Sequence, residues 1–318
     1  MRTDCHQHLW PEPLLDALRA RHTPPRLDRW TLQLTGEAPF VVRPCDVDPV
    51  ARAERELAEG TGRVLLSFSS PLGVEHLPPA EGARLLEAWN AGAAALGEPF
   101  GVWAAAGVAE PDPVALARVL EQRNVVGLQL PATALGEPAA LDRLGGLLEI
   151  LERADLPLLI HPGPAARPEA GPRLTPAWWP AVVPYVAQLH AAWYAWHVAG
   201  RCSFPRLRVA FVALAGLAPL HHERLAARGG ALGRIDPAVY YETSSYGTRA
   251  IDATVRVTGV DALVHGSDRP NAEPTDPGLG EAFSHALFVA NPQRLLTGGA
   301  AEPPRRSLAF QGAVGAAP

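Results

Sequence analysis

The chain has 318 residues, of which 47% are hydrophobic, and it carries a formal net charge of −5. This length can supply a large buried core, and the mildly acidic balance, without an arginine-rich run carrying interleaved aromatic residues, argues against nucleic acid as a partner. No lysine occurs anywhere in the chain, which excludes a Schiff-base lysine, a phosphate-loop lysine and a carbamylated lysine between two metals. Charges or prolines interrupt the apolar stretches well short of ~18 residues, so no membrane span is expected.

The cysteines are few and scattered, at Cys5, Cys45 and Cys202. An odd, dispersed set favours a reducing compartment over a disulfide framework. The first residues also lack the apolar run of a secretory signal. A cytoplasmic location is therefore expected.

The first predicted strand ends in His6 and His8. Strand side chains alternate with period two, so the two imidazoles share one face. Pro11 ends this run and leaves the pair at the carboxyl end of the strand, where α/β folds keep their chemistry. A helix over 12–22 follows. Residues 23–62 are irregular and proline-rich, and we expect an insertion with a small hairpin that forms a lid or rim.

From residue 63 the chain alternates regularly between apolar strands and amphipathic helices. The remaining strands are predicted at 64–68, 100–108, 125–130, 156–161, 207–214, 238–243 and 262–266. Near-continuous apolar strands with helices between them predict a parallel sheet covered on its outer face. Eight such units in ~300 residues favour a (β/α)8 TIM barrel with a small insertion after the first helix.

The barrel is predicted to occupy residues 1–297 as one domain. Residues 298–318 are rich in alanine, proline and glycine and are predicted to be a disordered tail. No G-x-G-x-x-G turn follows the first strand, which counts against a nucleotide-binding open sheet.

Four side chains of the ligand type fall at predicted strand ends. His6 and His8 end strand one, His161 ends strand five, and Asp268 follows strand eight. Three imidazoles and a carboxylate at one barrel mouth suit a single divalent ion, zinc above all. Such an ion lowers the pKa of a bound water towards neutrality, which makes the water a nucleophile or a proton donor.

Short motifs distributed along the chain carry a resemblance to a known family. They are Asp4-x-His6-x-His8, Ile160-His161-Pro162, Phe204-Pro205-x-Leu207, Gly266-Ser267-Asp268-x-Pro270 and Asn291-Pro292-x-Arg294-Leu295-Leu296. Together they resemble the amidohydrolase-related (amidohydrolase 2) family, in the branch of the aminocarboxymuconate-semialdehyde decarboxylase-like enzymes. The resemblance implies a (β/α)8 barrel in which His6, His8, His161 and Asp268 hold one metal ion, usually zinc.

The same resemblance implies a metal-dependent hydrolase or decarboxylase. Its expected substrate is a small organic acid, aromatic or unsaturated, or a related carbonyl compound, and a homodimer is an expectation from the family. In hydrolysis Asp268 would take the proton of the attacking water. The sequence does not choose between hydrolysis and decarboxylation.

One departure from the family pattern concerns strand six, which normally ends in an acid/base histidine. Pro219 and Arg224 keep the expected spacing, but the histidine position is Ala213. General acid–base help is worth ~10²–10⁴-fold in rate, and alanine cannot supply it. Three explanations stay open: His221 or His222 reaches the site, Asp268 acts as the sole base, or the protein is a catalytically impaired barrel that binds metal or ligand without turnover.

Three further residues are candidates for supporting roles. Glu242, at the end of strand seven, is expected to bond a ligand histidine from behind. Arg269, next to Asp268, is a candidate for bidentate pairing with a substrate carboxylate. Trp178 follows the long loop after strand five and is a candidate wall for an aromatic substrate.

Overall fold

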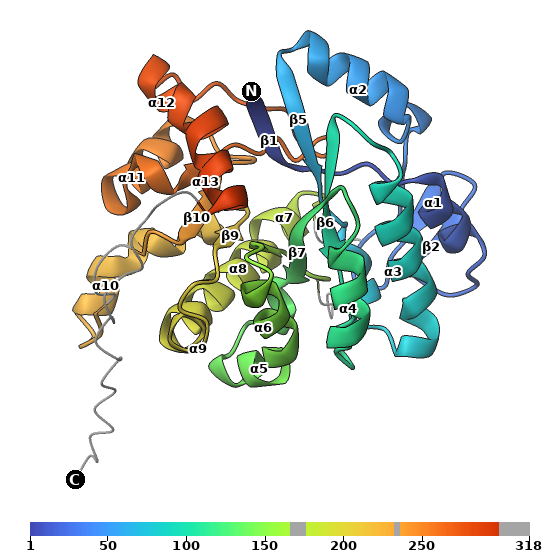
Figure 1. Ribbon diagram of the computed structural model, residues 1–318, viewed down its shortest axis with the longest axis horizontal. Coiled ribbons are helices and arrows are strands. Elements are labelled where there is room, and N and C mark those ends of the chain that lie inside the picture. The colour runs from blue at the N-terminus through green and yellow to red at the C-terminus, as the bar shows by residue number, and fades with distance from the viewer. Residues whose placement is uncertain (166–175, 232–235, 299–318) are drawn as a thin grey trace.

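Eight parallel strands form the centre of the molecule in a computed structural model that describes residues 1–165, 176–231 and 236–298 (Figure 1). Each strand pairs with the next one of the barrel along the chain, in the order β1-β5-β6-β7-β8-β9-β10-β11. Their bounds are β1 Arg2–Gln7, β5 Thr61–Leu66, β6 Phe100–Ala105, β7 Val125–Pro131, β8 Leu158–His161, β9 Val209–Phe211, β10 Val239–Glu242 and β11 Leu263–Val264. This architecture confirms the predicted (β/α)8 barrel.

The last gap of the barrel, between β11 and β1, is closed by backbone hydrogen bonds near the ends of these strands. The amide of Cys5 donates to the carbonyl of His265 at 2.8 Å, and the amide of Asp268 donates to the carbonyl of His6 at 2.9 Å. The amide of His8 in turn donates to the carbonyl of Arg269 at 2.6 Å. Closure therefore places the segment that carries Asp268 directly against the strand-one histidines.

Helices cover the outer face of the sheet. The α-helices are α1 Glu12–Arg19, α2 Pro49–Ala58, α3 Pro79–Ala94, α4 Pro113–Leu120, α5 Pro138–Arg143, α6 Gly145–Arg153, α7 Trp179–Val182, α8 Pro184–Ala195, α9 Arg201–Ser203, α10 His222–Ala226, α11 Thr248–Thr258, α12 Glu281–His285 and α13 Asn291–Thr297. Asp48 and Asp112 cap α2 and α4 by accepting hydrogen bonds from two first-turn amides each. The sequence predicted one helix over 178–199, but Pro184 cannot donate a backbone hydrogen bond, and the chain divides there into α7 and α8.

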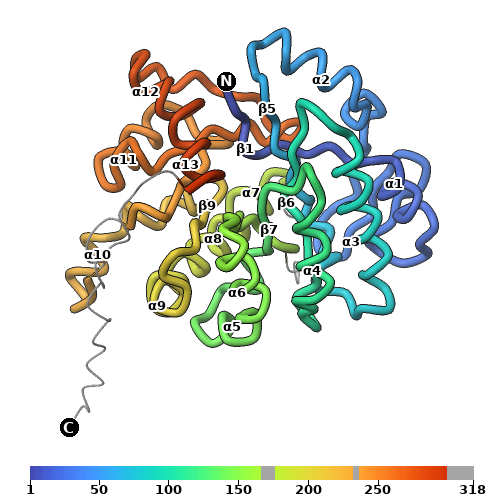
Figure 2. The backbone as a smooth tube through the Cα atoms, viewed as in Figure 1, coloured from blue at the N-terminus to red at the C-terminus, as the bar shows by residue number. Residues whose placement is uncertain are grey.

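The insertion after α1 is a three-stranded antiparallel sheet rather than a single hairpin. Its strands are β2 Arg26–Asp28, β3 Thr31–Gln33 and β4 Phe40–Val41, in the order β2-β3-β4. Its inner residues, Leu27 and Leu32, are buried in the same core cluster as residues of α1 and α3. Figure 2 shows α1 and α3 lying side by side on this flank of the barrel. The insertion is thus anchored to the barrel.

Strand six is shorter than predicted because the chain turns with left-handed geometry directly after it. From Ala213 to Leu217 every φ angle is positive, between 47° and 61°. L-residues avoid this conformation at a cost of roughly 1–2 kcal/mol each. Full burial of Leu214 and Ala215 holds the turn in place. At Gly216 a Cβ atom would lie 2.5 Å from the carbonyl oxygen of Val186, so only glycine fits.

The described elements run from Arg2 to Thr297. The predicted tail, apart from Gly298, lies outside the described residues, and the division of the chain at residue 297 stays a prediction. Among the described helices, none combines the length and the apolar character needed to cross a bilayer.

Candidate metal centre and its cavity

Three histidine rings meet at the carboxyl ends of β1 and β8. Each ring uses Nδ1 to bond an acceptor behind it: His6 bonds Glu242 Oε2 at 3.2 Å, His8 bonds the carbonyl of Ser67 at 2.9 Å, and His161 bonds the carbonyl of Pro162 at 2.9 Å. A carbonyl or carboxylate oxygen can only accept, so Nδ1 carries the hydrogen and Nε2 keeps its lone pair. The fold therefore directs the Nε2 lone pairs of all three imidazoles towards one point.

The mutual geometry of the rings is that of a ligand set. Ring centroids lie 4.9–5.2 Å apart with interplanar angles of 82–86°, and one ligand atom from each residue falls within 4.8 Å of the others. The Nε2 atoms of His6 and His8 are only 3.1 Å apart. Two lone pairs at this distance repel unless a cation or a proton lies between them. The donor set therefore fits a divalent ion that prefers imidazole nitrogen.

Asp268 completes the cluster from the loop after β11. Its Oδ1 lies 3.2 Å from His8 Nε2 and 3.7 Å from His6 Nε2. Burial alone would raise the pKa of Asp268, but its contact with His8, and the positive charge that His6, His8 and His161 carry when protonated, lower it to about 2. Asp268 has a left-handed φ of 59°, a conformation that aspartate tolerates better than most residues. The side chain is thus an ionised carboxylate aimed at the three rings.

Glu242, at the end of β10, supports the cluster from below. It is fully buried, and besides His6 it accepts hydrogen bonds from the Ser244 hydroxyl at 2.8 Å and from the Ala213 amide at 3.1 Å. Gly266 makes room for it, because a Cβ there would lie 2.2 Å from Glu242 Oε1. The predicted support of a ligand histidine by this carboxylate agrees with the geometry.

The pKa values of two rings respond to this environment. Burial lowers the pKa of His6, but the hydrogen bond and charge of Glu242, with the charges of Asp268 and Asp4, outweigh it and raise the pKa overall. Burial, together with the charges of the other two rings, holds the pKa of His161 well below its usual value. His161 is therefore neutral, as a metal ligand must be.

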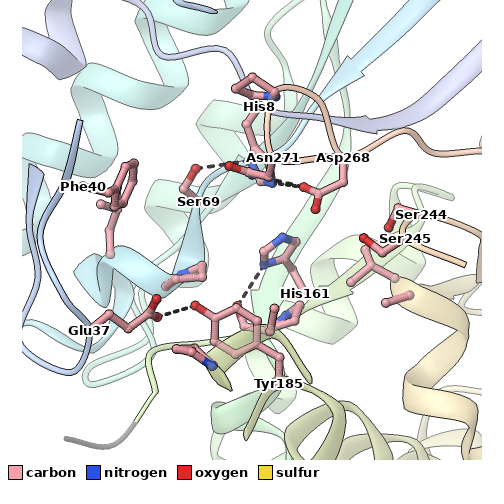
Figure 3. Close-up of a pocket in the computed structure, with 18 of the residues that line it drawn as sticks. His8, Glu37, Phe40, Ser69, His161, Tyr185, Ser244, Ser245, Asp268 and Asn271 are labelled. Carbon is pink, nitrogen blue, oxygen red and sulfur yellow. Dashed lines mark hydrogen bonds and ion pairs between the residues drawn. The ribbon is translucent and has the colours of Figure 1, made fainter. Parts of the chain in front are cut away.

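The cluster forms one end of a cavity of about 670 Å³, drawn in Figure 3. Apolar side chains from β3, β4, α8 and the loop after β5 make most of its wall. The polar residues that line it besides the cluster are Glu37, Arg43, Asp46, Ser69, Tyr185, Ser244, Ser245, Tyr246 and Asn271. In Figure 3, Glu37 and Tyr185 lie on the opposite side of His161 from Asp268. Such a chamber has the size and apolar character of a small-molecule site.

Two sequence-predicted substrate contacts are not brought to this cavity. Arg269 points the other way and binds Glu56 and Glu59 at 2.7 Å each and Glu273 at 3.1 Å, because the backbone alternates direction after Asp268. Its side chain lines a separate surface hollow. Trp178 is 56% exposed and stacks against Trp179, outside the cavity lining. Both expectations are corrected.

The structure shows whether another histidine lies near Ala213 and could replace the missing acid/base group. Ala213 lines the cavity, and among the described residues the histidines that do so are only His6, His8 and His161. His221 is exposed and packs its ring against His190, with centroids 4.9 Å apart. A neighbouring histidine therefore does not replace the family's strand-six residue.

Glu37 and Tyr185 are the lining residues that sequence reasoning missed. Tyr185 donates a hydrogen bond to Glu37, joining α8 to the loop between β3 and β4. Glu37 stands in an irregular insertion and Tyr185 in a helix of low polarity, so neither position carries a motif. Their pairing depends on the tertiary fold alone.

Comparison with known proteins gives no match to any family model or to any curated protein sequence. Solved structures do match over most of their length. IDCase of Metarhizium anisopliae has a TM-score of 0.75 at 16% identity, covering 93% of this chain and 97% of that one. The 5-carboxyvanillate decarboxylase LigW of Sphingomonas paucimobilis has 0.71 at 19% identity, covering 93% and 98%.

A third similar structure was solved with a metal. The 5-carboxyvanillate decarboxylase LigW2 of Novosphingobium aromaticivorans, with bound manganese and a hydroxy-methoxy-nitrobenzoic acid, has a TM-score of 0.67 at 15% identity, covering 93% of this chain and 97% of that one. At these identities the likeness establishes the fold. That fold is the barrel implied by the resemblance to amidohydrolase-related proteins.

Proposed function

We propose that this protein is a metal-dependent decarboxylase of the amidohydrolase type that acts on a small aromatic carboxylic acid. The observation that carries the proposal is the convergence of three Nε2 lone pairs, from His6, His8 and His161, with the ionised Asp268 at one end of an apolar cavity. Support comes from the similar solved structures, since two of those described above are decarboxylases of an aromatic acid.

The ligand residues are inferred to be His6, His8, His161 and Asp268. A divalent ion held there would act as a Lewis acid on a carboxylate or carbonyl oxygen of the substrate. Imidazole-rich sites suit zinc, whereas the LigW2 structure holds manganese, so zinc is the proposed ion and manganese the first alternative. Glu242 fixes the tautomer and orientation of His6.

Asp268 is the proposed proton carrier. Decarboxylation leaves the electron pair of the broken carbon–carbon bond on the ring carbon, which must then receive a proton. An ionised Asp268 would first take a proton from a substrate hydroxyl or from water, and because its pKa is low it would give that proton up readily to the carbon. The apolar wall around Val186, Leu189 and Val212 would exclude bulk water and strengthen these interactions.

The test is release of carbon dioxide from a panel of hydroxylated and methoxylated benzoates by protein fully loaded with Zn²⁺ or Mn²⁺. The expected result is turnover of at least one acid, reduced ~10²–10⁴-fold in Asp268→Asn and unchanged in Asp252→Asn, an exposed control. Amides and lactones are assayed in parallel, because hydrolysis on the same site would appear there. No turnover of any compound with metal bound would favour the catalytically impaired barrel suggested by Ala213.

The location, the oligomeric state and the ligand of the protein are also proposals. A cytoplasmic location is inferred from the scattered, unpaired cysteines, and a homodimer from the family resemblance. The partner proposed on chemical grounds is a small-molecule acid.

A further inference from the structure

The side of the cavity that lies across His161 from Asp268 carries an acidic group that the proposed reaction does not use. Glu37 is half-buried there and accepts the hydroxyl hydrogen of Tyr185 through Oε1. A carboxylate offers about four lone-pair positions, so a single bond from Tyr185 leaves most of its accepting capacity unused. Figure 3 shows this pair across His161 from Asp268, on the same chamber.

The arginine that lines this cavity is already paired with another carboxylate, that of Asp46. Arg43 is the only arginine among the described lining residues, and it is 66% exposed at the rim. Its guanidinium binds both oxygens of Asp46, with Nε–Oδ2 at 2.8 Å and Nη2–Oδ1 at 2.9 Å. Besides the metal cluster, the charged residues of the described wall are one arginine and two acidic residues, Glu37 and Asp46. The formal charge of this part of the wall is therefore −1.

The remainder of this wall is apolar. It is built by residues of the insertion and of the helices that follow β8: Leu32, Leu34, Phe40, Val42, Val182 and Val186. A carboxylate brought here would lose hydration, find no free cation among the described residues and face the charge of Glu37. Like charges placed together at a binding surface repel, which makes such a wall selective against the wrong ligand.

The pKa values of the pair reflect their burial. The pKa of Glu37 is raised overall by burial, although the hydrogen bond from Tyr185 acts in the opposite direction and favours the ionised form. Burial and the charge of Glu37 raise the pKa of Tyr185 as well, so the phenol keeps its hydrogen at neutral pH. The Glu37 carboxyl group is therefore held in place by a permanent donor.

We propose that the Glu37–Tyr185 pair is the distal recognition site of the cavity, and that it selects acids whose far end carries a hydrogen-bond donor, either a neutral hydroxyl or an amine, and rejects acids with a second carboxylate. The inference rests on the proposed function only in that the near carboxylate is taken to lie at the histidines. It names the substrate class: an aromatic monocarboxylic acid with a donor group opposite its carboxylate.

The experiment measures binding of three acids with one skeleton to the full-length protein loaded with Mn²⁺, by calorimetry. They are 4-(aminomethyl)benzoate, 4-(hydroxymethyl)benzoate and 4-(carboxymethyl)benzoate, each with a two-ring homologue. The expected result is that the amine and the alcohol bind at least tenfold more tightly than the dicarboxylate. In Glu37→Gln the difference shrinks below threefold, because the amide removes the charge and adds a donor. Glu149→Gln, an exposed helix residue, should keep the wild-type ranking.

Several outcomes would overturn the inference. These are equal or tighter binding of the dicarboxylate by the wild type, an unchanged ranking in Glu37→Gln, and no binding of any of the acids. Tyr185→Phe keeps the charge of Glu37 and must keep the ranking; loss of the ranking in this variant as well would contradict the assignment of the ranking to that charge.

Failure of this inference is distinguishable from failure of the proposed function. The ranking is a binding measurement and needs no turnover. A protein that ranks the acids as expected but releases no carbon dioxide from any acid keeps the recognition site and loses the decarboxylase assignment. Turnover without the expected ranking would keep the decarboxylase assignment and remove the recognition site.

Discussion

The two ends of the cavity are built in different ways. At the histidine end, every polar group comes from a strand end or the loop directly after it, and His6, His8 and His161 are at most 5% exposed, each held by a bond behind the ring. At the far end, Glu37 and Tyr185 are half-buried, and their single mutual bond spans two separate elements. A barrel thus fixes its reactive groups through the sheet, whereas an inserted sheet can vary the wall opposite them.

The largest expected effect is at the histidine end. The double change His6→Ala, His8→Ala removes two of three converging lone pairs, so bound metal should fall from about one ion per chain to background. Elemental analysis after dialysis measures this. His22→Ala, an exposed histidine outside the cavity, is the control. Equal metal in the double variant and the wild type would remove the proposed centre.

The loop after β5 contributes Ser69, Pro71 and Leu72 to the cavity wall, and the stability of the protein should depend on pH through Glu75 in this loop. This side chain is fully buried, and its described side-chain partner is Ser70, so burial raises its pKa from 4.5 to about 7. A raised acid pKa means that the folded state binds the proton more tightly. Stability is then lost as pH rises from about 4.5 to about 7, by roughly 3 kcal/mol at ~1.36 kcal/mol per pH unit.

Glu75→Gln should therefore stabilise the protein above pH 7 by up to roughly 3 kcal/mol and have little effect near pH 4.5. Urea unfolding of both proteins across this range measures the difference. Glu149→Gln should show no such pH-dependent gain. A constant difference between Glu75→Gln and wild type at all pH values would contradict the assignment of the shift to this carboxyl group.

A smaller loss is expected when the support behind His6 is changed. Glu242→Gln keeps the size of the side chain but weakens the acceptor that orients the ring, and such changes typically cost ~10–100-fold in metal affinity. Competition with a chelator measures it in Zn²⁺-loaded protein. Affinity within twofold of the wild type would show that Glu242 serves only to hold Ser244 and Ala213.

The smallest effect belongs to the far end. Tyr185→Phe removes one half-buried hydrogen bond and should lower the free energy of unfolding by ~1 kcal/mol. Tyr246→Phe is the matched control, because its hydroxyl also belongs to a cavity residue but has no partner among the described residues. A Tyr185→Phe protein as stable as Tyr246→Phe would mean that the bond to Glu37 does not anchor the insertion.

The features that sequence reasoning could predict are those governed by local periodicity. The eight strands follow from apolar runs separated by helices, and the convergence of His6, His8, His161 and Asp268 follows from their place at strand ends. Parallel strand pairing in a barrel brings the carboxyl ends of the strands to one rim, independently of the conformation of the loops. Glu242 lies beside His6 for the same reason, at the end of β10.

The predictions that failed concern residues whose positions depend on the direction of the side chain and on tertiary contacts. Arg269 follows Asp268 in sequence, but the chain alternates direction there and the guanidinium meets the buried Glu56 away from the cavity. The three-stranded insertion, the left-handed turn after β9 and the Glu37–Tyr185 bond are set by packing between distant segments. None of these has a local pattern, because the residues involved are ordinary for loops and helices.

The central claim is that one divalent ion binds the three Nε2 atoms and Asp268. Its most direct test is a crystal of the Mn²⁺-loaded protein measured for anomalous scattering. We expect a single strong peak bonded to Nε2 of His6, His8 and His161 and to the Asp268 carboxylate, with the cavity beside Ala213 open to substrate. A peak bonded through Nδ1, a peak elsewhere, or none in this cluster would contradict it.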